Sequence, residues 1–299
     1  MSQRSRARTD SRTSVRFRAQ RVLLRFLARA APFLAASLGE RMFFTPPPAR
    51  GSRGLSALRN AEPIALEVDG RRVAAWRWGS GPAVGLLHGW GGRAAQLSSF
   101  VDPLLARGFS VVALDAPGHG ESGRGLSSAP QFARALRAAA DAVGGFHGVV
   151  AHSLGAAAVA LAIRDGLGVA RVVLIGAADE PPLWVERFSA RLGLPPHVVD
   201  AMRRRSERRL GMSWSELNVP RLAASFEAPL LLIHDSDDPD VAIGDAQAIV
   251  AAWPRATLVE TTGLGHNGPL RAPEVVARAA DFLFAGLELR GHEGGRSVA

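Results

Sequence analysis

Short apolar segments alternate with longer helix-forming segments over much of this chain. Uninterrupted apolar runs, such as residues 83–87, are typical of strands in a parallel sheet whose two faces are both covered. The sequence therefore predicts an α/β fold with a mostly parallel central sheet and helices on both faces. The strands expected in this part are residues 83–87, 109–114, 147–151 and 169–175, and the helices are 94–106, 131–143 and 154–165.

An antiparallel pair of strands is expected before the first of these segments. Asp69-Gly70 separates the alternating runs 64–68 and 73–78, and Asp-Gly is among the strongest signals for a two-residue hairpin turn. After residue 227 the strand and helix pattern resumes. It gives strands at 229–234 and 256–260 and helices at 245–252 and 273–287.

The pattern is interrupted between residues 179 and 227, where helical segments occur at 183–192, 196–210 and 214–222. An insertion that follows a sheet strand is expected to form a lid, because ligands bind outside the carboxyl ends of the strands. We therefore predict four parts. They are a basic N-terminal extension (1–54), an α/β core (55–178 and 228–288), a helical lid (179–227) and a flexible tail (289–299).

Positive charge is concentrated at the N-terminus. The net charge is +9, and residues 1–29 alone contain nine arginines and one aspartate, so the rest of the chain is close to neutral. Lysine is absent while alanine, glycine and proline are abundant, which we attribute to the codon bias of a GC-rich genome. No nucleic-acid partner is expected, because no recognisable binding motif accompanies the charge. The lack of cysteine excludes disulfides and thiolate metal sites.

The N-terminal extension combines two kinds of sequence. Residues 1–20 are rich in arginine and serine and are expected to be disordered. Residues 22–44 are apolar, but charges and Pro32 interrupt them before they reach the roughly 20 residues that span a bilayer. An amphipathic helix is expected here, and the apolar side chains at helical spacing are Leu23, Phe26, Leu27, Ala30 and Leu34.

Three interpretations of this helix stay open. It packs on the domain, it lies on an anionic membrane surface, or it belongs to a targeting segment. We expect a cytoplasmic protein, and peripheral membrane contact through residues 1–44 is the alternative that remains.

The segment 149–155, Val-Val-Ala-His-Ser-Leu-Gly, joins a predicted strand to a predicted helix through small residues around Ser153. A sharp turn of this kind presents the serine hydroxyl above the sheet and directs backbone N–H groups at the atom that it attacks. Serine is also a common helix N-cap, so the segment alone leaves a structural role open. A catalytic role needs a positioned base to remove the proton from the hydroxyl.

Two residues after later strands are candidates for the base and for the acid that orients it. His266 lies in the glycine-rich segment 263–268, and the pKa of an imidazole suits it to accept and return a proton. Asp238 follows the strand at 229–234 and could hold the imidazole in one tautomer. The acidic cluster around it could instead bind a hard cation, although its spacing is not that of an EF-hand loop.

A glycine-rich turn, His-Gly-Trp-Gly-Gly at residues 88–92, follows another predicted strand. The backbone N–H groups of Trp90 and Leu154 are candidates to stabilise a developing oxyanion. Gly89 and His152 are candidates for the substrate pocket.

Together these residues resemble the α/β-hydrolase superfamily, and serine esterases and thioesterases with a short helical lid in particular. The similarity rests on the order Ser153, Asp238, His266, on the turn at 88–91, and on Asp-Ala-Pro-Gly-His-Gly-Glu-Ser at 115–122, and it covers residues 62–287. It implies Ser153 as nucleophile, His266 as base and Asp238 as acid. Asp238 is preferred over Asp237 because the family acid usually reads D-x-x-V.

The sequence departs from the family pattern at three positions. Ala151 stands where a glycine usually precedes the nucleophile, Asp235 stands at another usual glycine, and Ala242 replaces a usual proline. None of these removes a catalytic group. We interpret Asp235, like Asp237 and Asp240, as part of a solvated loop.

The sequence thus predicts a serine hydrolase that cleaves a carboxylic ester or thioester of a small-molecule acyl substrate through an acyl-enzyme, with no metal or organic cofactor. An acyltransferase, a C–C bond hydrolase and a non-catalytic binding protein on the same fold are the alternatives. Neither the acyl group nor the oligomeric state follows from the sequence.

Overall fold

The computed structural model describes residues 18–49, 54–180 and 183–293. The chain divides into two compact units. Residues 46–181 and 216–299 form one, which we call the sheet unit, and residues 1–45 and 182–215 form the other, which we call the helical unit. This division groups the N-terminal extension with the insertion, whereas the sequence-based boundaries separated them. The disorder expected for residues 1–17 lies outside the described residues.

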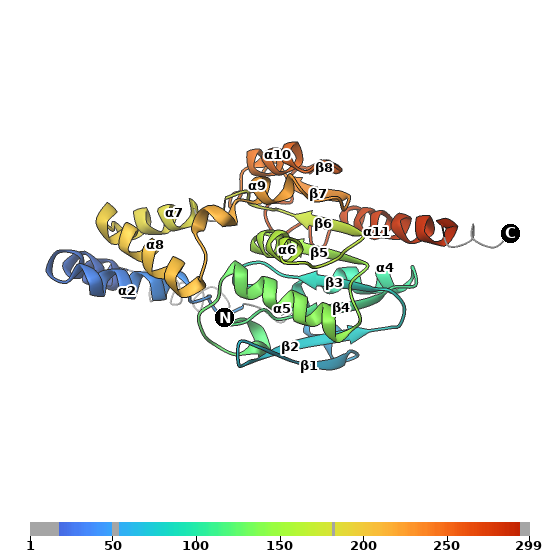
Figure 1. Ribbon diagram of the computed structural model, residues 1–299, viewed down its shortest axis with the longest axis horizontal. Coiled ribbons are helices and arrows are strands. Elements are labelled where there is room, and N and C mark those ends of the chain that lie inside the picture. The colour runs from blue at the N-terminus through green and yellow to red at the C-terminus, as the bar shows by residue number, and fades with distance from the viewer. Residues whose placement is uncertain (1–17, 50–53, 181–182, 294–299) are drawn as a thin grey trace, which may run out of the picture. The chain divides into compact units, whose positions relative to one another are not determined.

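Eight strands form one sheet in the sheet unit, in the order β1-β2-β4-β3-β5-β6-β7-β8 (Figure 1). The pairs β1–β2 and β2–β4 are antiparallel, and the other neighbouring pairs are parallel. The expected α/β class, with its mostly parallel sheet, is therefore confirmed. The strands are β1 Glu62–Val68, β2 Arg71–Trp78, β3 Ala83–Leu87, β4 Ser110–Leu114, β5 Gly148–His152, β6 Arg171–Ile175, β7 Leu230–Asp235 and β8 Ala256–Thr261.

The hairpin between β1 and β2 forms as expected. Asp69 and Gly70 both have positive φ angles, 53° and 69°, which is what a two-residue turn matching the twist of antiparallel strands requires. Glycine accepts this conformation without steric cost, and aspartate is one of the few other residues that tolerate it.

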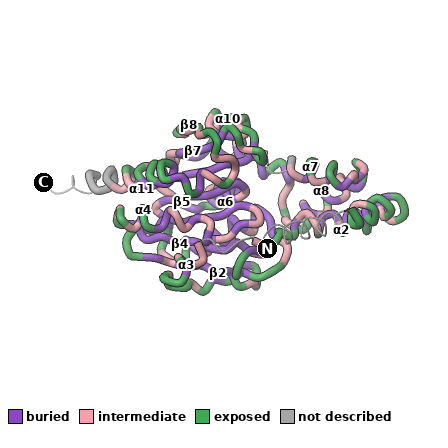
Figure 2. Tube along the Cα trace, turned by 180° about the vertical axis from the view of Figure 1, so that it is seen from behind, coloured by how far each residue is buried: buried purple, intermediate pink, exposed green. Residues whose placement is uncertain are grey.

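Helices cover both faces of the sheet. On one face α5 packs on α6, α6 contacts α9, and α9 contacts α10, whereas α11 lies with α4 and η1 on the other (Figures 1 and 2). The sheet unit contains α3 Leu55–Leu58, η1 Ala94–Phe100, α4 Val101–Leu105, η2 Gly120–Ser122, α5 Ala129–Ala142, α6 Leu154–Arg164, α9 Val219–Ala223, α10 Ile243–Ala252 and α11 Pro273–Glu293, and η3 spans Trp214–Leu217 at the boundary between the units.

Burial explains why the inner strands are predominantly apolar. Every residue of β3, β4, β5 and β7 is buried, because helices cover both sides of the sheet (Figure 2). The side chains of one face meet those of α11, η1 and α4 in a single core that includes Phe100, Phe109 and Leu283.

Three helical segments differ from the sequence-based expectation, and one of them, 214–222, is divided at Asn218 into η3 and α9. Residues 94–106 form a 3₁₀ helix, η1, followed by the short α4, and the change comes just before Pro103, which lacks an N–H group and is tolerated only in the first turn of an α-helix. Helix α11 continues past Leu287 to Glu293. The last described residues are therefore helical where a flexible tail was expected from residue 289 onward.

The helical unit contains residues 18–30, which are helical, together with α2 Pro32–Phe43, α7 Leu183–Leu192 and α8 Pro196–Leu210. Arg18, Ala19 and Gln20 are thus helical where disorder was expected. Helix α2 packs on α8, and the buried carboxylate of Glu40 accepts hydrogen bonds from Arg205 (3.1 Å) and Arg209 (2.9 Å). These ion pairs connect the N-terminal extension to the insertion.

The apolar stripe expected in the N-terminal extension faces solvent over most of its length. Leu23, Phe26 and Leu34 are all exposed, and the residues of these two helices that pack inward are others, such as Leu24 and Ala35. The stripe is thus not the packed side of these helices, which pack within the helical unit through other residues. No helix among the described residues is long and apolar enough to cross a membrane.

The Glu40 ion pairs give a test of the helical unit. We expect Glu40→Ala to lower the free energy of unfolding of this unit by about 2 kcal/mol, because the change leaves Arg205 and Arg209 without their buried partner. Hydrogen exchange of the amides in α2 and α8 measures the effect. Glu186→Ala, an exposed acid on α7, is the control and should change protection little; equal effects of the two changes would contradict the assigned role.

Candidate functional site

Ser153 occupies a sharp turn between β5 and α6. Its φ and ψ angles are 53° and −120°, and in the described part of the chain only Asp69 shares a positive φ among the non-glycine residues. A side chain in this conformation is strained and persists because the surrounding structure fixes it. The side chain of Ser153 is held at the carboxyl end of β5, as the sequence predicted for this segment.

Two glycines make the close packing around this turn feasible. A Cβ on Gly155 would lie 2.9 Å from the carbonyl oxygen of His88 and 3.0 Å from that of Leu87, so α6 can approach β3 only with glycine there. A Cβ on Gly89 would lie 2.8 Å from the Cβ of Ser153. The loop after β3 therefore touches the serine turn directly. Ala151 fits at the other side of the turn, fully buried in β5.

The two backbone amides predicted to stabilise an oxyanion border this contact. Trp90 is in the loop after β3, and Leu154 is the first residue of α6. Within the described part of the chain neither N–H group donates a hydrogen bond. For Leu154 this follows from its place, because the first N–H groups of a helix have no partner within the helix and carry partial positive charge.

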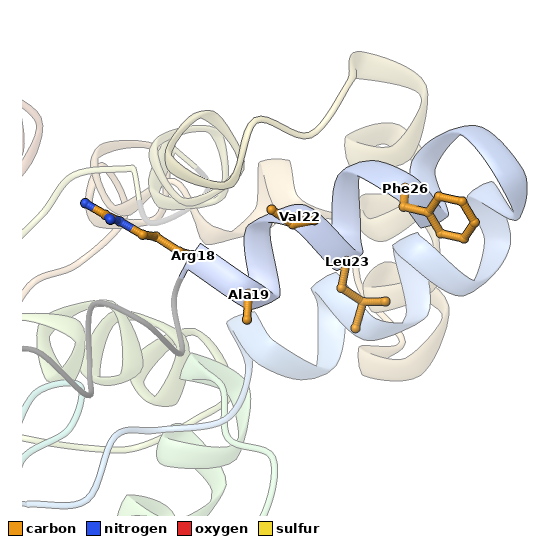
Figure 3. A pocket seen from close by; sticks show the side chains of 5 residues that line it. All are labelled: Arg18, Ala19, Val22, Leu23 and Phe26. Carbon is orange, nitrogen blue, oxygen red and sulfur yellow. The ribbon is translucent and has the colours of Figure 1, made fainter.

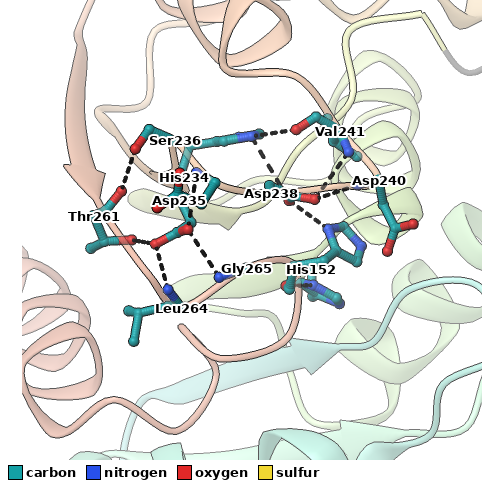
Figure 4. A network of polar contacts seen from close by, with 12 residues as sticks. His152, His234, Asp235, Ser236, Asp238, Asp240, Val241, Thr261, Leu264 and Gly265 are labelled. Carbon is teal, nitrogen blue, oxygen red and sulfur yellow. Dashed lines mark hydrogen bonds and ion pairs between the residues drawn. The ribbon is translucent and has the colours of Figure 1, made fainter.

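His266 and Asp238 are joined by a hydrogen bond. Nδ1–H of His266 donates to Oδ2 of Asp238 over 2.7 Å, while Oδ1 of Asp238 accepts the backbone N–H groups of Asp240 (2.8 Å) and Val241 (3.0 Å) (Figure 4). The Asp238 side chain is only 1% exposed. A carboxylate bound in this way holds a ring proton on Nδ1 of His266, so Nε2 is the nitrogen that can take up or release a further proton.

Gly176, at the end of β6, leaves room for this pair. It has a φ of 57°, and a Cβ there would lie 3.3 Å from Nδ1 of His266. The sequence shows a glycine directly after a buried strand at this position, but that pattern does not identify which residues the glycine contacts.

His152 lies between the serine turn and the His266–Asp238 pair. Its Nε2–H donates to the carbonyl oxygen of His266 (3.0 Å), and the two rings are 4.6 Å apart. Burial, followed by repulsion from His266 when that ring is protonated, lowers the pKa of His152 to about 3. In the described part of the chain the Ser153 hydroxyl makes no hydrogen bond to His266. The structure therefore brings Asp238 and His266 together and places His152, the residue before Ser153, against them.

Asp235 has a role that the sequence analysis missed. Its side chain is buried rather than solvated, which makes the solvated-loop interpretation of this residue wrong. Its Oδ1 accepts the N–H of Gly265 (2.9 Å), and its Oδ2 accepts the N–H of Leu264 (3.1 Å) and the hydroxyl of Thr261 (2.8 Å) (Figure 4). Asp235 thus holds the loop that carries His266.

Opposing effects act on the Asp235 carboxyl. Burial by itself raises its pKa, but the hydrogen bonds from Thr261 and from the amides of Gly265, Leu264 and Asp237 outweigh burial and leave the pKa lowered. A signal for this role was present in the sequence, since an acid directly after a buried strand precedes a glycine-rich loop with amides to satisfy. Asp237 accepts the N–H of Gly263 (2.9 Å) in the same loop.

Two buried histidines join the loop after β3 to the segment 115–122. Nδ1–H of His88 donates to Gly89 (2.7 Å) and its Nε2 accepts the N–H of Ala116 (3.0 Å). His119 makes the opposite connection from the segment 115–122 to the loop after β3, because its Nε2 accepts the N–H of Gly91 (3.0 Å). Each ring is therefore neutral, because a proton on Nε2 would face an N–H donor.

The surroundings of these two rings agree with their hydrogen bonds. Burial lowers the pKa of His88 to about 4, and burial, with repulsion from His88 once that ring is protonated, lowers the pKa of His119 to about 3. Both residues order their loops through hydrogen bonds.

One group of side chains has a spacing that could hold a cation. Ligand atoms of Asp238, Asp240 and His266 all lie within 4.8 Å of one another. However, both oxygens of Asp238 already accept N–H groups, including that of His266, so these side chains suit a hydrogen-bonded pair better than a metal site. The absence of a metal cofactor stays an expectation from the sequence.

Comparison with known proteins relates the chain to a large group of enzymes. The sequence model of the family described as the alpha/beta hydrolase family matches residues 86–279. A non-heme haloperoxidase from Rhodococcus erythropolis is 38% identical over 146 residues, which are 47% of this chain and 53% of that protein. The chain thus spans about half the length of this curated relative.

Solved structures share the fold at low sequence identity. An esterase from Rhodococcus sp. is 18% identical with a TM-score of 0.54, covering 75% of this chain and 98% of the esterase. A thioesterase domain from the curacin biosynthetic pathway is 18% identical with a TM-score of 0.56, covering 75% of this chain and 99% of the domain. At such identities the likeness concerns the fold alone.

The neutral histidines make stability depend on pH. Below about pH 6.5 the unfolded chain binds protons that folded His88 does not, so the free energy of unfolding falls as the pH drops toward 4. From about pH 7 to about pH 5 the loss due to His88 should be about 2 kcal/mol. Urea unfolding at both pH values measures this decrease in the free energy of unfolding, and His88→Gln should remove the part that is due to His88. His197→Gln, at an exposed position, should leave the dependence intact; the same dependence in His88→Gln as in the wild type would refute the assignment.

The Asp235 hydrogen bonds give a second prediction. We expect Asp235→Ala to lower the free energy of unfolding by about 3 kcal/mol, because the amides of Leu264 and Gly265 lose a buried charged acceptor. Chemical denaturation measures this, and hydrogen exchange should show faster exchange of those two amides. Ser236→Ala, at the exposed neighbouring position, is the control with little expected effect. Unchanged exchange in Asp235→Ala would contradict the role.

Proposed function

The chain belongs to the α/β-hydrolase family, and on that premise we propose that this hydrolase is a serine enzyme that cleaves a carboxylic ester or thioester through an acyl-enzyme intermediate. The observation that carries the proposal is the 2.7 Å hydrogen bond between His266 and Asp238, combined with the strained turn at Ser153.

In the proposed reaction Ser153 attacks the acyl carbonyl while Nε2 of His266 takes the hydroxyl proton. Asp238 keeps the proton of His266 on Nδ1 and stabilises the imidazolium that forms. His266 then gives its proton to the departing alcohol or thiol. Water, activated by the same imidazole, attacks the acyl-enzyme and releases the acid.

The negative charge that develops on the carbonyl oxygen needs nearby donors. The amides of Trp90 and Leu154, which have no partner within the described part of the chain, are proposed to supply them. Such preorganised donors act most strongly where water is excluded. The contact between Gly89 and the serine turn supports this assignment, because it fixes the loop of Trp90 against the turn that starts at Ser153.

The proposal extends to the binding of a small acyl substrate. Gly89 and His152 are proposed to border the pocket, and neutral His152 would add no charge there, since its pKa is lowered to about 3. The insertion at 179–227 keeps its proposed role as a lid because it follows β6, and ligands of such sheets bind at the carboxyl ends of strands. Acyl transfer to an alcohol or amine is the alternative on the same residues.

A fluorophosphonate probe tests the proposal. We expect covalent labelling of the wild type and none of Ser153→Ala, because the probe reacts only with an activated serine. Asp238→Asn should lower the rate of p-nitrophenyl ester hydrolysis by about 10⁴-fold, since the imidazole loses the partner that sets its tautomer. Ser225→Ala, at an exposed position, should react like the wild type.

Two results would overturn the proposal. Equal labelling of Ser153→Ala and wild type would show that another group reacts, and a folded wild type that neither labels nor hydrolyses graded p-nitrophenyl or coenzyme A esters would favour a binding protein. Product analysis with an added alcohol distinguishes acyl transfer from hydrolysis.

A further inference from the structure

The exposed large apolar side chains of the described residues are confined to one short segment. They are Val22 (69% exposed), Leu23 (48%), Phe26 (66%), Phe33 (67%) and Leu34 (54%). Single exposed apolar residues are normal on a protein surface, but a contiguous group marks a site of interaction. The segment 22–34 of the helical unit is therefore the best candidate for a contact surface.

The first three of these side chains share one side of a helix. In the helix of residues 18–30, exposed Ala19, Val22, Leu23 and Phe26 follow one another at helical spacing, and they line a shallow depression together with Arg18 (Figure 3). Leu24 and Ala28, on the other side, are buried. One apolar side of this helix thus packs within the helical unit. The other apolar side has no protein partner among the described residues.

The other two side chains begin the next helix. Phe33 and Leu34 lie in the first turn of α2, directly after the break at Ala31, and Phe26 lies about one helical turn before the end of the preceding helix. Three of the five exposed side chains are therefore close to the turn between the two helices. We call the five residues, with Arg18 and Ala19, the apolar face.

Positive charge accompanies the apolar face. Residues 18–34 contain four arginines and no acid, and Arg18 and Arg29 are exposed. The helical unit as a whole has 17 arginines and five acidic residues, a net charge of +12, which leaves −3 for the sheet unit. The charge of the protein is thus concentrated in the unit that bears the apolar face.

We propose that the apolar face docks the protein on an anionic lipid bilayer, with the two N-terminal helices lying in the interface. Helices that bind in this way combine an apolar side with arginine or lysine and have no need to span the membrane. Acidic headgroups attract such charge, and the attraction weakens as salt is added. A second copy of this chain is a poor occupant, because it would bring another +12 against the first.

The connection between α2 and α8 makes docking relevant to the whole helical unit. Glu40 holds Arg205 and Arg209 of α8, and Phe43 packs edge-on against Phe188 of α7, with ring centroids 5.3 Å apart. The helices that bear the apolar face are therefore an integral part of the unit that contains the insertion. A docked N-terminus would hold α7 and α8 near the lipid surface.

Vesicle co-sedimentation of the full-length protein tests the proposal. Vesicles of phosphatidylcholine alone are compared with vesicles in which about a third of the lipid is phosphatidylglycerol. We expect the protein to sediment with the anionic vesicles and to be released by salt. Leu23→Ser combined with Phe26→Ser should weaken the apparent affinity about tenfold or more, because two exposed apolar side chains no longer enter the interface.

Variants that remove charge measure the electrostatic contribution to vesicle binding separately from the apolar one. Arg18→Gln combined with Arg29→Gln should reduce the preference for anionic vesicles several-fold. The matched pair Arg72→Gln and Arg278→Gln, at exposed positions of the sheet unit, removes the same charge and should bind like the wild type. Fluorophosphonate labelling and circular dichroism of each variant show whether it is folded, independently of the vesicles.

Three outcomes would overturn the proposal. The first is a wild type that does not sediment with anionic vesicles, or sediments equally with both kinds. The second is unchanged binding of folded Leu23→Ser/Phe26→Ser. The third is a dimer in light scattering that this double variant separates, which would show that a second copy covers the face.

Discussion

The close packing of three chain segments around Ser153 is the constraint on which the candidate site depends. Helix α6 approaches β3 within the distance that only Gly155 allows, and the loop after β3 touches Ser153 because Gly89 has no side chain. This packing fixes the positive φ of Ser153, which would be unfavourable in a flexible loop. The same contacts leave the amides of Trp90 and Leu154 without partners in the described chain, so one steric arrangement determines both the hydroxyl and the candidate oxyanion donors.

Buried polar groups then hold the loops around that turn. Neutral His88 and His119 bind backbone groups of facing loops, and ionised Asp235 binds the amides of the loop that carries His266. Buried polar groups that are fully hydrogen-bonded make a loop rigid, whereas unpartnered ones would destabilise it. The side chains proposed for catalysis are thus only part of the polar set at the carboxyl ends of the strands, and the remainder determines where they point.

The two units divide the physical properties of the protein between them. The sheet unit has the large apolar core and a slightly negative charge, while the helical unit has most of the positive charge and the exposed apolar side chains. A hydrolase of this family whose helical unit contacts lipid would encounter acyl compounds that partition into the bilayer. The basic composition of the chain, which codon bias explains in bulk, therefore has a local distribution that bulk composition does not describe.

The sequence by itself determined the features that arise from local patterns. Apolar runs separated by helices were enough to predict the parallel sheet, and Asp69-Gly70 was enough to predict the hairpin. The order of Ser153, Asp238 and His266 proposed the candidate site through a family resemblance, and strand ends of a parallel sheet meet at one edge. Only the tertiary structure decided that Asp235 is buried, that the N-terminal helices join the insertion in one unit, and that Leu23 and Phe26 face outward. These features depend on contacts between residues far apart in the chain, and helical periodicity shows that a face is apolar without showing what covers it.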